Sequence, residues 1–266
     1  MTPHPPRAAT AAFPGDHRLG DPDLDAFVVH DPRRLRRILV SMITALVAVI
    51  ASVSGLNVAQ QQLAIDLGAS QNMLLWIING YTMVLAALLL PIGAIGDRWG
   101  RKYVLLLGLG LFAGASVLAA FAGSATVMLL ARLVAGAGAA MIMPVTLSVV
   151  TSSFPEDKRA NAIGVWAGFA GAGGILGLFF SAAMVDWFSW RWLFVMPIAL
   201  CLIAAVLTWT SVDNSREVHE HSFDVLGGVL SAIAIGGLVL AFHEGPEHGW
   251  TESLTVLGLV AGIAGT

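Results

Sequence analysis

The densest group of charged residues in this chain is a short segment between two long apolar runs, Gly-Ala-Ile-Gly-Asp-Arg-Trp-Gly-Arg-Lys, from Gly93 to Lys102. It holds one acid, Asp97, and three bases, which are Arg98, Arg101 and Lys102. Because hydrocarbon does not accept charge at this density, we expect the segment to form a loop at a membrane face. The small residues on its N-terminal side would let two helices approach each other closely.

A second candidate is Arg132, a base that lies inside an apolar run. An arginine within a membrane span costs about 2.5–3.5 kcal/mol on insertion scales. We therefore expect Arg132 to have an acidic partner or a water-filled cavity, or else to extend its side chain toward the membrane edge.

No catalytic pattern accompanies these charges. The sequence has no His-Glu-x-x-His, no Gly-x-Ser-x-Gly and no phosphate-binding loop, so we expect no enzymatic activity, no cofactor and no metal. There is no basic patch that would favour nucleic-acid binding. Four histidines lie in stretches that we interpret as polar loops with solvated side chains; they are His219, His221, His243 and His248.

The composition indicates a polytopic membrane protein. Of 266 residues, 57% are hydrophobic and 12% are charged, and the mean hydropathy is +0.80. A soluble domain is typically about 25% charged. The single cysteine, Cys201, lies in an apolar run, where it is expected to pack between helices and cannot form an intrachain disulfide.

Seven apolar runs reach the roughly 20 residues that a membrane span requires, and an eighth is shorter. We expect helices, because these runs lack the two-residue alternation of membrane β-barrel strands. The predicted spans are 38–60, 73–96, 103–122, 126–149, 161–185, 190–211 and 224–243, followed by 253–266.

These spans divide the chain into four parts. Residues 1–37, rich in Pro, Asp and Ala, are predicted to be a disordered tail rather than a cleavable signal. The spans of 38–211 would form a six-helix bundle, and 212–223 a linker. Residues 224–266 would then add one complete and one incomplete extra helix to this all-α membrane fold.

The basic residues favour one orientation. Nearly all lie in the tail and in the loops after spans 2, 4 and 6, which the positive-inside rule places in the cytoplasm together with the N-terminus. Only Arg191, between spans 5 and 6, departs from this bias. The protein is therefore predicted to be a multi-pass protein of the plasma membrane.

Glycines concentrate in spans 4 and 5. They allow close helix packing in lipid, and they also make a helix pliable. Two interpretations stay open: static packing, or helices that slide and bend during function. The gating candidates are Gly136, Gly138, Gly173, Gly174 and Gly177.

A cavity for aromatic cations is a further possibility, because aromatic and Met side chains bind such ligands. An interface belt or ordinary packing is the alternative for each residue. The candidates are Asn57, Gln60, Trp76, Tyr81, Met141 and Trp166.

The segment from Gly93 to Lys102, read as Gly-x-x-x-Asp-Arg-x-Gly-Arg-Lys with its second glycine at Gly100, resembles the loop between spans 2 and 3 of the major facilitator superfamily. Other segments resemble its fourteen-span drug:proton antiporter branch. They are Leu56-Asn57-Val58-Ala59, Ala131-Arg132-Leu133-Val134-Ala135-Gly136, Ser189-Trp190-Arg191-Trp192-Leu193-Phe194, and Glu244-Gly245-Pro246-Glu247-x-Gly249-Trp250.

The resemblance implies alternating access, in which two six-helix halves rock around a central site and inward proton flow drives export. Asp97 would bind a helix N-terminus and pair with nearby bases, stabilising one conformation until it is protonated. The three bases would hold the loop at the anionic leaflet, or act only as topology anchors. Arg132 would be linked to proton coupling and to Asp97.

The chain departs from this branch in three places. Ser52 stands where the branch usually has an acid in span 1, so coupling through that acid is lost or carried elsewhere. In span 5, Gly177-Leu178 replaces the usual Gly-Pro. The chain reaches Thr266 within the eighth run, about half the length of the branch.

We therefore expect a proton-coupled transporter that exports small amphipathic molecules or drugs, with the lipid bilayer, its substrate and protons as partners. The alternative is a truncated, transport-inactive half that needs a complementary second half. A receptor or channel is disfavoured by the lack of a ligand-binding domain or filter sequence.

Overall fold

The structure, a computed structural model, describes residues 27–215 and 224–265, and within these ranges the regular elements are all helical. The elements are α2 (Pro32–Val58), α3 (Gln60–Leu67), α4 (Gln71–Trp99), α5 (Arg101–Ala120), α6 (Ala125–Ser153), α7 (Glu156–Trp187), the 3₁₀ helix η2 (Trp190–Phe194), α8 (Val195–Ser211), α9 (Val225–His248) and α10 (Ser253–Ala264).

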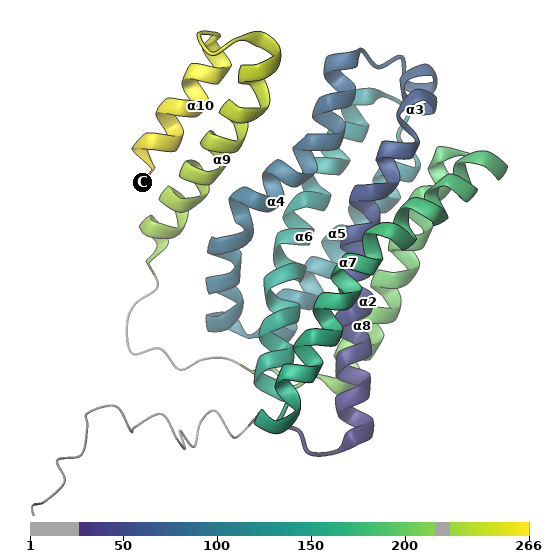
Figure 1. The fold of residues 1–266 in the computed structure, drawn as a ribbon, viewed down its shortest axis with the longest axis vertical. Coiled ribbons are helices and arrows are strands. Elements are labelled where there is room, and N and C mark those ends of the chain that lie inside the picture. The colour runs from purple at the N-terminus through teal and green to yellow at the C-terminus, as the bar shows by residue number, and fades with distance from the viewer. Residues whose placement is uncertain (1–26, 216–223, 266) are drawn as a thin grey trace, which may run out of the picture.

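Six long helices, α2 and α4 to α8, run side by side as a bundle, and the hairpin of α9 and α10 lies to one side of it, against α4 (Figure 1). In the described part of the chain, seven helical segments are long and apolar enough to cross a membrane. The expected all-α membrane fold is thus confirmed. The helix α10 is apolar but has only 12 residues.

Helix α2 begins six residues before the predicted span. The Asp31 side chain accepts a hydrogen bond from the backbone N–H of Arg33, and Pro32 occupies the first helical position. Both are favourable at a helix N-terminus. The predicted tail of 1–37 therefore overlaps a helix from Pro32 onward, and residues 1–26 lie outside the described part.

The first span also ends differently from the prediction. Helix α2 stops at Val58, and Gln60, the last residue of the predicted span, instead begins a separate short helix, α3, followed by Gln61 and Gln62. Helix α3 ends at Leu67 and is capped by Gly68, whose φ of 58° is the left-handed conformation that glycine adopts without strain. The polar end of the first span is thus a distinct element at the bundle surface.

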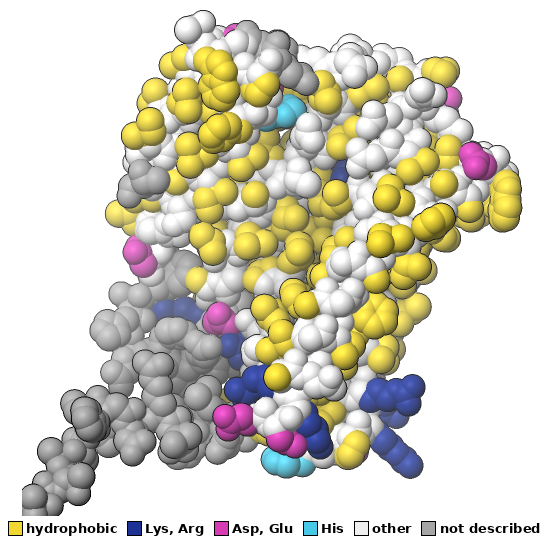
Figure 2. Space-filling view, viewed as in Figure 1, with side chains coloured by type: hydrophobic (Ala, Val, Ile, Leu, Met, Phe, Trp, Pro, Cys, Tyr) yellow, Lys and Arg dark blue, Asp and Glu magenta, His cyan; other side chains and the backbone are white. Residues whose placement is uncertain are grey.

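Lys and Arg side chains gather at the lower end of the bundle in Figure 2. We call this the basic end; it comprises the start of α2, the α4–α5 junction and the end of α8. The opposite end, which carries α3, is the α3 end. Between the two ends, exposed side chains are predominantly apolar, as expected for a surface that faces lipid.

Close helix crossings inside the bundle depend on small residues. A Cβ atom added at Gly136 of α6 would lie 2.5 Å from the backbone oxygen of Tyr81 in α4. One added at Gly138 would lie 2.9 Å from the backbone nitrogen of Phe112 in α5. Such clearances allow backbones to approach in the way that membrane helix pairs commonly do.

Candidate functional site

The charged segment at the basic end is not the loop that we predicted. Asp97 and Arg98 lie in the last turn of α4, Arg101 and Lys102 in the first turn of α5, and Gly100 alone separates the two helices. Gly100 reverses the chain with a φ of 110°, a conformation that other residues rarely adopt. The charges are therefore held on rigid helix ends.

Asp97 pairs with Arg101 across this junction. The Asp97 Oδ1 atom accepts from Arg101 Nε and lies 2.9 Å from both Nε and Nη2. Each charge lies at the unfavourable end of its own helix dipole, an acid near a C-terminus and a base at an N-terminus. The attraction between Asp97 and Arg101 offsets the unfavourable interaction of each charge with its helix dipole. The Arg101 side chain is only 8% exposed.

The residues that follow α8 cover this junction. The backbone N–H of Arg101 donates to the Ser215 carbonyl at 3.0 Å, and the Asn214 side chain packs directly against Gly100. A side chain at position 100 would therefore collide with Asn214 as well as strain the backbone. Residues from 212 onward were predicted to form a linker, but the described ones, 212–215, are part of this site.

Further contacts tie the same segment to the rest of the basic end. Arg34 in α2 binds the Ser211 carbonyl at 2.9 Å and the Asp213 carboxylate at 2.6 Å. Lys102 donates to the Trp209 carbonyl at 2.8 Å. The end of α8 is thus a junction that links α2 to the Asp97–Arg101 pair. Gly93, one turn before Asp97, would place a Cβ 3.5 Å from Pro144 of α6.

Arg132 is buried, with 1% of its surface exposed, and does not extend to the membrane edge. Its Nη1 atom donates to Ser52 Oγ at 3.1 Å, and its guanidinium carbon lies 4.2 Å from the Tyr81 ring centroid. Among the described residues no carboxylate lies within ion-pair distance of it. The neutral Ser52 therefore stands where the expected acidic partner would be.

Arg132 does not touch Asp97. It lies in the first third of α6, and Ser153 at the basic end is 21 residues further along that helix. At 1.5 Å per residue this separation is about 30 Å. A link between Arg132 and Asp97 would have to pass through the packing of α4 against α6.

The six predicted cavity residues do not line one pocket. Tyr81 is fully buried: its ring packs against Phe112 and its hydroxyl donates to the Val49 carbonyl at 3.3 Å. Trp166 donates to Thr146 Oγ1 at 3.3 Å, and Met141 packs against α5. Gln60 donates to Asn57 on the exposed α2–α3 surface. Sequence alone could not separate buried from cavity-facing residues.

The predicted gating glycines all lie at or near helix contacts. Gly136 and Gly138 are at the tight α6 crossings described above. In α7, a Cβ at Gly177 would lie 2.7 Å from Ala51 Cα of α2, whereas Gly173 and Gly174 leave ordinary contact distances of 3.5 and 3.6 Å. Close packing accounts for three of the five positions, and motion of these helices stays a prediction.

Arg191, the exception to the charge bias, has an acidic partner that sequence reasoning missed. Its Nη1 atom lies 3.5 Å from Asp66 Oδ2 of α3 and its guanidinium stacks 4.3 Å from the Trp190 ring. Trp190 also donates to Asp66 at 2.8 Å. These contacts close the α3 end by joining α3 to η2, the short helix that precedes α8.

His243 and His248 are also not in a loop, because α9 extends to His248. The His243 ring packs edge-on against Trp76 of α4, with centroids 5.3 Å apart. Its Nδ1 atom lies 3.4 Å from Asn79 Nδ2. Among the described residues no group of three or more His, Cys, Asp or Glu could hold a metal ion. His219 and His221 lie outside the described part.

A bundle of apolar helices with an acid–base pair at a helix junction and an added hairpin is the architecture of a multi-pass membrane protein. The chain belongs to the major facilitator superfamily: residues 40–265 match the model of the family described as Major Facilitator Superfamily.

Curated relatives are named for resistance. The Methyl viologen resistance protein SmvA of Salmonella typhimurium is 35% identical over 223 residues, covering 82% of this chain and 45% of that protein. The Methylenomycin A resistance protein of Streptomyces coelicolor is 33% identical over 214 residues, covering 80% and 45%. The chain thus spans about half the length of the curated relatives it matches.

Solved structures agree on the fold. A bacterial homologue of the human lysosomal transporter Spinster, in an inward-facing conformation, superposes with a TM-score of 0.63 at 18% identity, covering 89% of this chain and 60% of that one. The POT family transporter PepTSo gives a TM-score of 0.64 at 14% identity, covering 89% of this chain and 52% of that one.

Proposed function

We propose that this chain contributes the N-terminal six helices and the inserted hairpin of a proton-driven exporter of small amphipathic molecules, drugs among them. The names of the resistance relatives support export of toxic compounds as the activity. The observation that carries the proposal is the Asp97–Arg101 pair, held at the α4–α5 junction by the end of α8. A transporter that alternates between two conformations needs contacts of this kind that form in one and break in the other.

The exporter would lie in the plasma membrane with the basic end and the N-terminus in the cytoplasm. The gathering of Lys and Arg at that end supports this orientation. Arg191 is a single base at the α3 end, where it pairs with Asp66, against several bases at the basic end.

Alternating access would take place against a complementary C-terminal half. The α7 surface supports this partner: Gly164, Gly168 and Gly171 have no atoms within 4 Å of an added Cβ, and Phe179 is 74% exposed. Small residues on an open helix face suit close packing by another helix. A chain that transports only when this second half is supplied is the second candidate function.

The test is efflux of a panel of cationic dyes from cells that express the chain with and without a second half. Export should collapse when a protonophore removes the proton gradient. Asp97→Asn should lower the initial rate about tenfold, because a charge-assisted hydrogen bond contributes about 1.5–3 kcal/mol. Asp157→Asn, an exposed acid at the same end, is the matched control and should leave the rate unchanged.

An Asp97→Asn variant that exports as fast as its parent, at equal expression, would contradict the role of the ion pair. Export that persists without a proton gradient would refute proton coupling. Dye efflux that never exceeds that of empty cells, even with the second half, would refute the transport proposal.

A further inference from the structure

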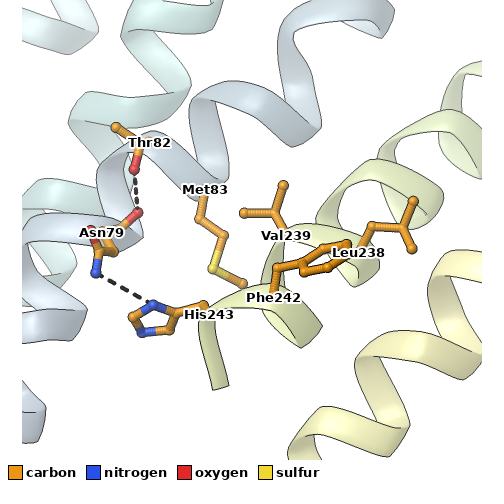
Figure 3. A pocket seen from close by; sticks show the side chains of 7 residues that line it. All are labelled: Asn79, Thr82, Met83, Leu238, Val239, Phe242 and His243. Carbon is orange, nitrogen blue, oxygen red and sulfur yellow. Dashed lines mark hydrogen bonds between the residues drawn. The ribbon is translucent and has the colours of Figure 1, made fainter. Parts of the chain in front are cut away.

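A pocket of about 350 Å³ separates α4 from α9 near the α3 end. Figure 3 shows Met83 and Phe242 on its apolar side, and Asn79 facing His243 across its polar side. Nothing in the proposed transport mechanism uses this place. It lies within the contact between α4 and α9, by which the inserted hairpin is held to the six-helix bundle.

One titratable group, His243, lines the polar side of the pocket, and the next residue in α9, Glu244, is shielded from solvent without lining the pocket. The His243 side chain is 12% exposed and that of Glu244 is 4% exposed. His243 Nε2 lies 3.8 Å from Glu244 Oε1, while the other ring nitrogen faces Asn79 at 3.4 Å. Among the carboxylates of the described ion pairs, that of Glu244 is the most buried, since Asp97 keeps 31% of its side-chain surface.

We propose that His243 is a proton-binding site, seated between Asn79 and Glu244, and that the bound proton tightens the contact between α4 and α9. The chemistry is that of the ring. A neutral imidazole has one donor and one acceptor nitrogen, whereas an imidazolium donates from both. One N–H of the charged ring would then meet the Asn79 amide oxygen after an amide flip, and the other would point toward the Glu244 carboxylate.

Other charged groups around the pocket are few. In α4, Tyr81 is bound to α2 and α6, and Asp97 and Arg98 lie at the opposite end. Helix α10 holds no titratable side chain, and Glu252 at its start is exposed and caps it. On α9 itself, Glu247 and His248 follow within one turn of Glu244, so His248 is the competing site that an experiment must separate.

Glu244 neighbours His243 in α9, so its carboxylate stabilises the charged ring without itself reaching α4. The contact that crosses to α4 is the one with Asn79, and a hydrogen bond from a charged ring is stronger than one to a neutral ring. Protonation should therefore favour the docked hairpin, and the gain should disappear as the pH rises through the range in which histidines titrate, about pH 5 to 8. The proton site would lie on the hairpin of the proposed exporter. Only a role of this site in transport rests on the proposed function. As a binding site it stands on the geometry alone.

Cysteine cross-linking can measure the docking. A Cβ at Gly236 of α9 would lie 3.3 Å from Ala87 Cβ of α4, close to disulfide geometry. The pair Ala87→Cys/Gly236→Cys, built on Cys201→Ala to remove the native thiol, should oxidise faster when the hairpin is docked. The purified full chain in detergent would be oxidised at pH 5.5 and at pH 8 with and without His243→Gln.

The ratio of the two rates at each pH cancels the intrinsic pH dependence of thiol oxidation. At pH 5.5 we expect the parent to cross-link about fivefold faster than His243→Gln, a factor at the lower end of the range typical of coupling between two sites. At pH 8 we expect the two proteins to cross-link at the same rate. His30→Gln, an exposed histidine at the basic end, should match the parent at both. Equal ratios at both pH values, or a pH effect removed by His248→Gln and not by His243→Gln, would overturn the proposal.

A second measurement needs no cysteine pair. In histidine-labelled protein, the ring resonances that vanish in His243→Gln should move when the pH is lowered from 8 to 5.5, because the ring gains a proton. Resonances that do not move with pH would overturn the site. Dye efflux is measured separately. If His243 responds to pH and alters cross-linking in a chain that shows no efflux, the result supports the proton site and refutes the transport function.

Discussion

At the scale of a single residue, Arg132 is the clearest case of a buried charge with neutral partners. It is buried against Ser52 Oγ and the Tyr81 ring, at the position where the resemblance to the antiporter branch led us to expect an acid. Removing one partner of a buried ion pair typically costs 3–5 kcal/mol, because a charge is left uncompensated. This chain carries that cost and offsets part of it through the hydroxyl and the ring.

Restoring the acid should therefore stabilise the chain. Ser52→Asp would place a carboxylate beside Arg132 Nη1, and we expect the free energy of unfolding to rise by about 1–2 kcal/mol, part of the cost of an unpaired buried charge. Thermal denaturation in detergent measures it. In an Arg132→Leu background the same change should destabilise, since the new carboxylate is then alone. Equal effects in both backgrounds would show that the two side chains do not interact.

At the scale of elements, glycines in two different helices can play opposite roles. Replacing glycine by alanine in a helix normally stabilises by about 0.5–1 kcal/mol. At Gly136 the added Cβ would press on the Tyr81 carbonyl at 2.5 Å, whereas Gly164 of α7 faces open space. Because α4 and α6 approach closely at Gly136, the substitution to alanine should destabilise the chain there, whereas at Gly164 it should keep its usual stabilising effect.

We predict that Gly136→Ala lowers the melting temperature of the purified chain, by an amount that corresponds to about 1–3 kcal/mol of overpacking. Gly164→Ala should raise it slightly. Gly136→Ala and Gly164→Ala make the same chemical change in two membrane helices. Effects of the scan conditions and of the detergent are therefore the same for both variants. A stabilised Gly136→Ala would mean that the α4–α6 crossing is looser than the structure has it.

The helices also show how much of the fold can be predicted from a single sequence. Apolar runs of span length identified all seven long helices, because lipid leaves a buried backbone few alternatives to the helix. The helix ends were missed where a single residue decides them, as Asp31 does for α2 and Gly100 for the α4–α5 junction. Local propensity competes there with tertiary contacts that are not visible in the sequence.

The candidate site was harder to predict than the fold. Its acid and bases could be named from their density between two spans, but not the end of α8 that holds them. Arg34 pairs with Asp213 from 179 residues away, and Arg191 with Asp66 from 125. A single sequence carries no signal that joins positions so far apart, and it cannot tell the buried Tyr81 from a cavity wall.

At the scale of the whole molecule, the proposed orientation can be tested with one matched pair of positions. Asp157 starts α7 at the basic end, Asp186 ends the same helix at the α3 end, and both are exposed. Their 29-residue separation is about 44 Å of helix, more than the roughly 30 Å hydrocarbon core. The two positions must therefore lie on opposite sides of the membrane if α7 spans it.

In a Cys201→Ala background, a membrane-impermeant maleimide added to intact cells should label Asp186→Cys and leave Asp157→Cys unlabelled until the cells are permeabilised. The two variants replace the same residue type, so differences in thiol reactivity are small beside the difference in access. The Lys and Arg residues near a span set its direction of insertion. Removing the bases beside Asp157 should therefore weaken the difference in labelling between the two cysteine variants. Labelling of Asp157→Cys in intact cells would place the basic end outside, and with it the Asp97–Arg101 pair that the transport proposal assigns to the cytoplasmic face.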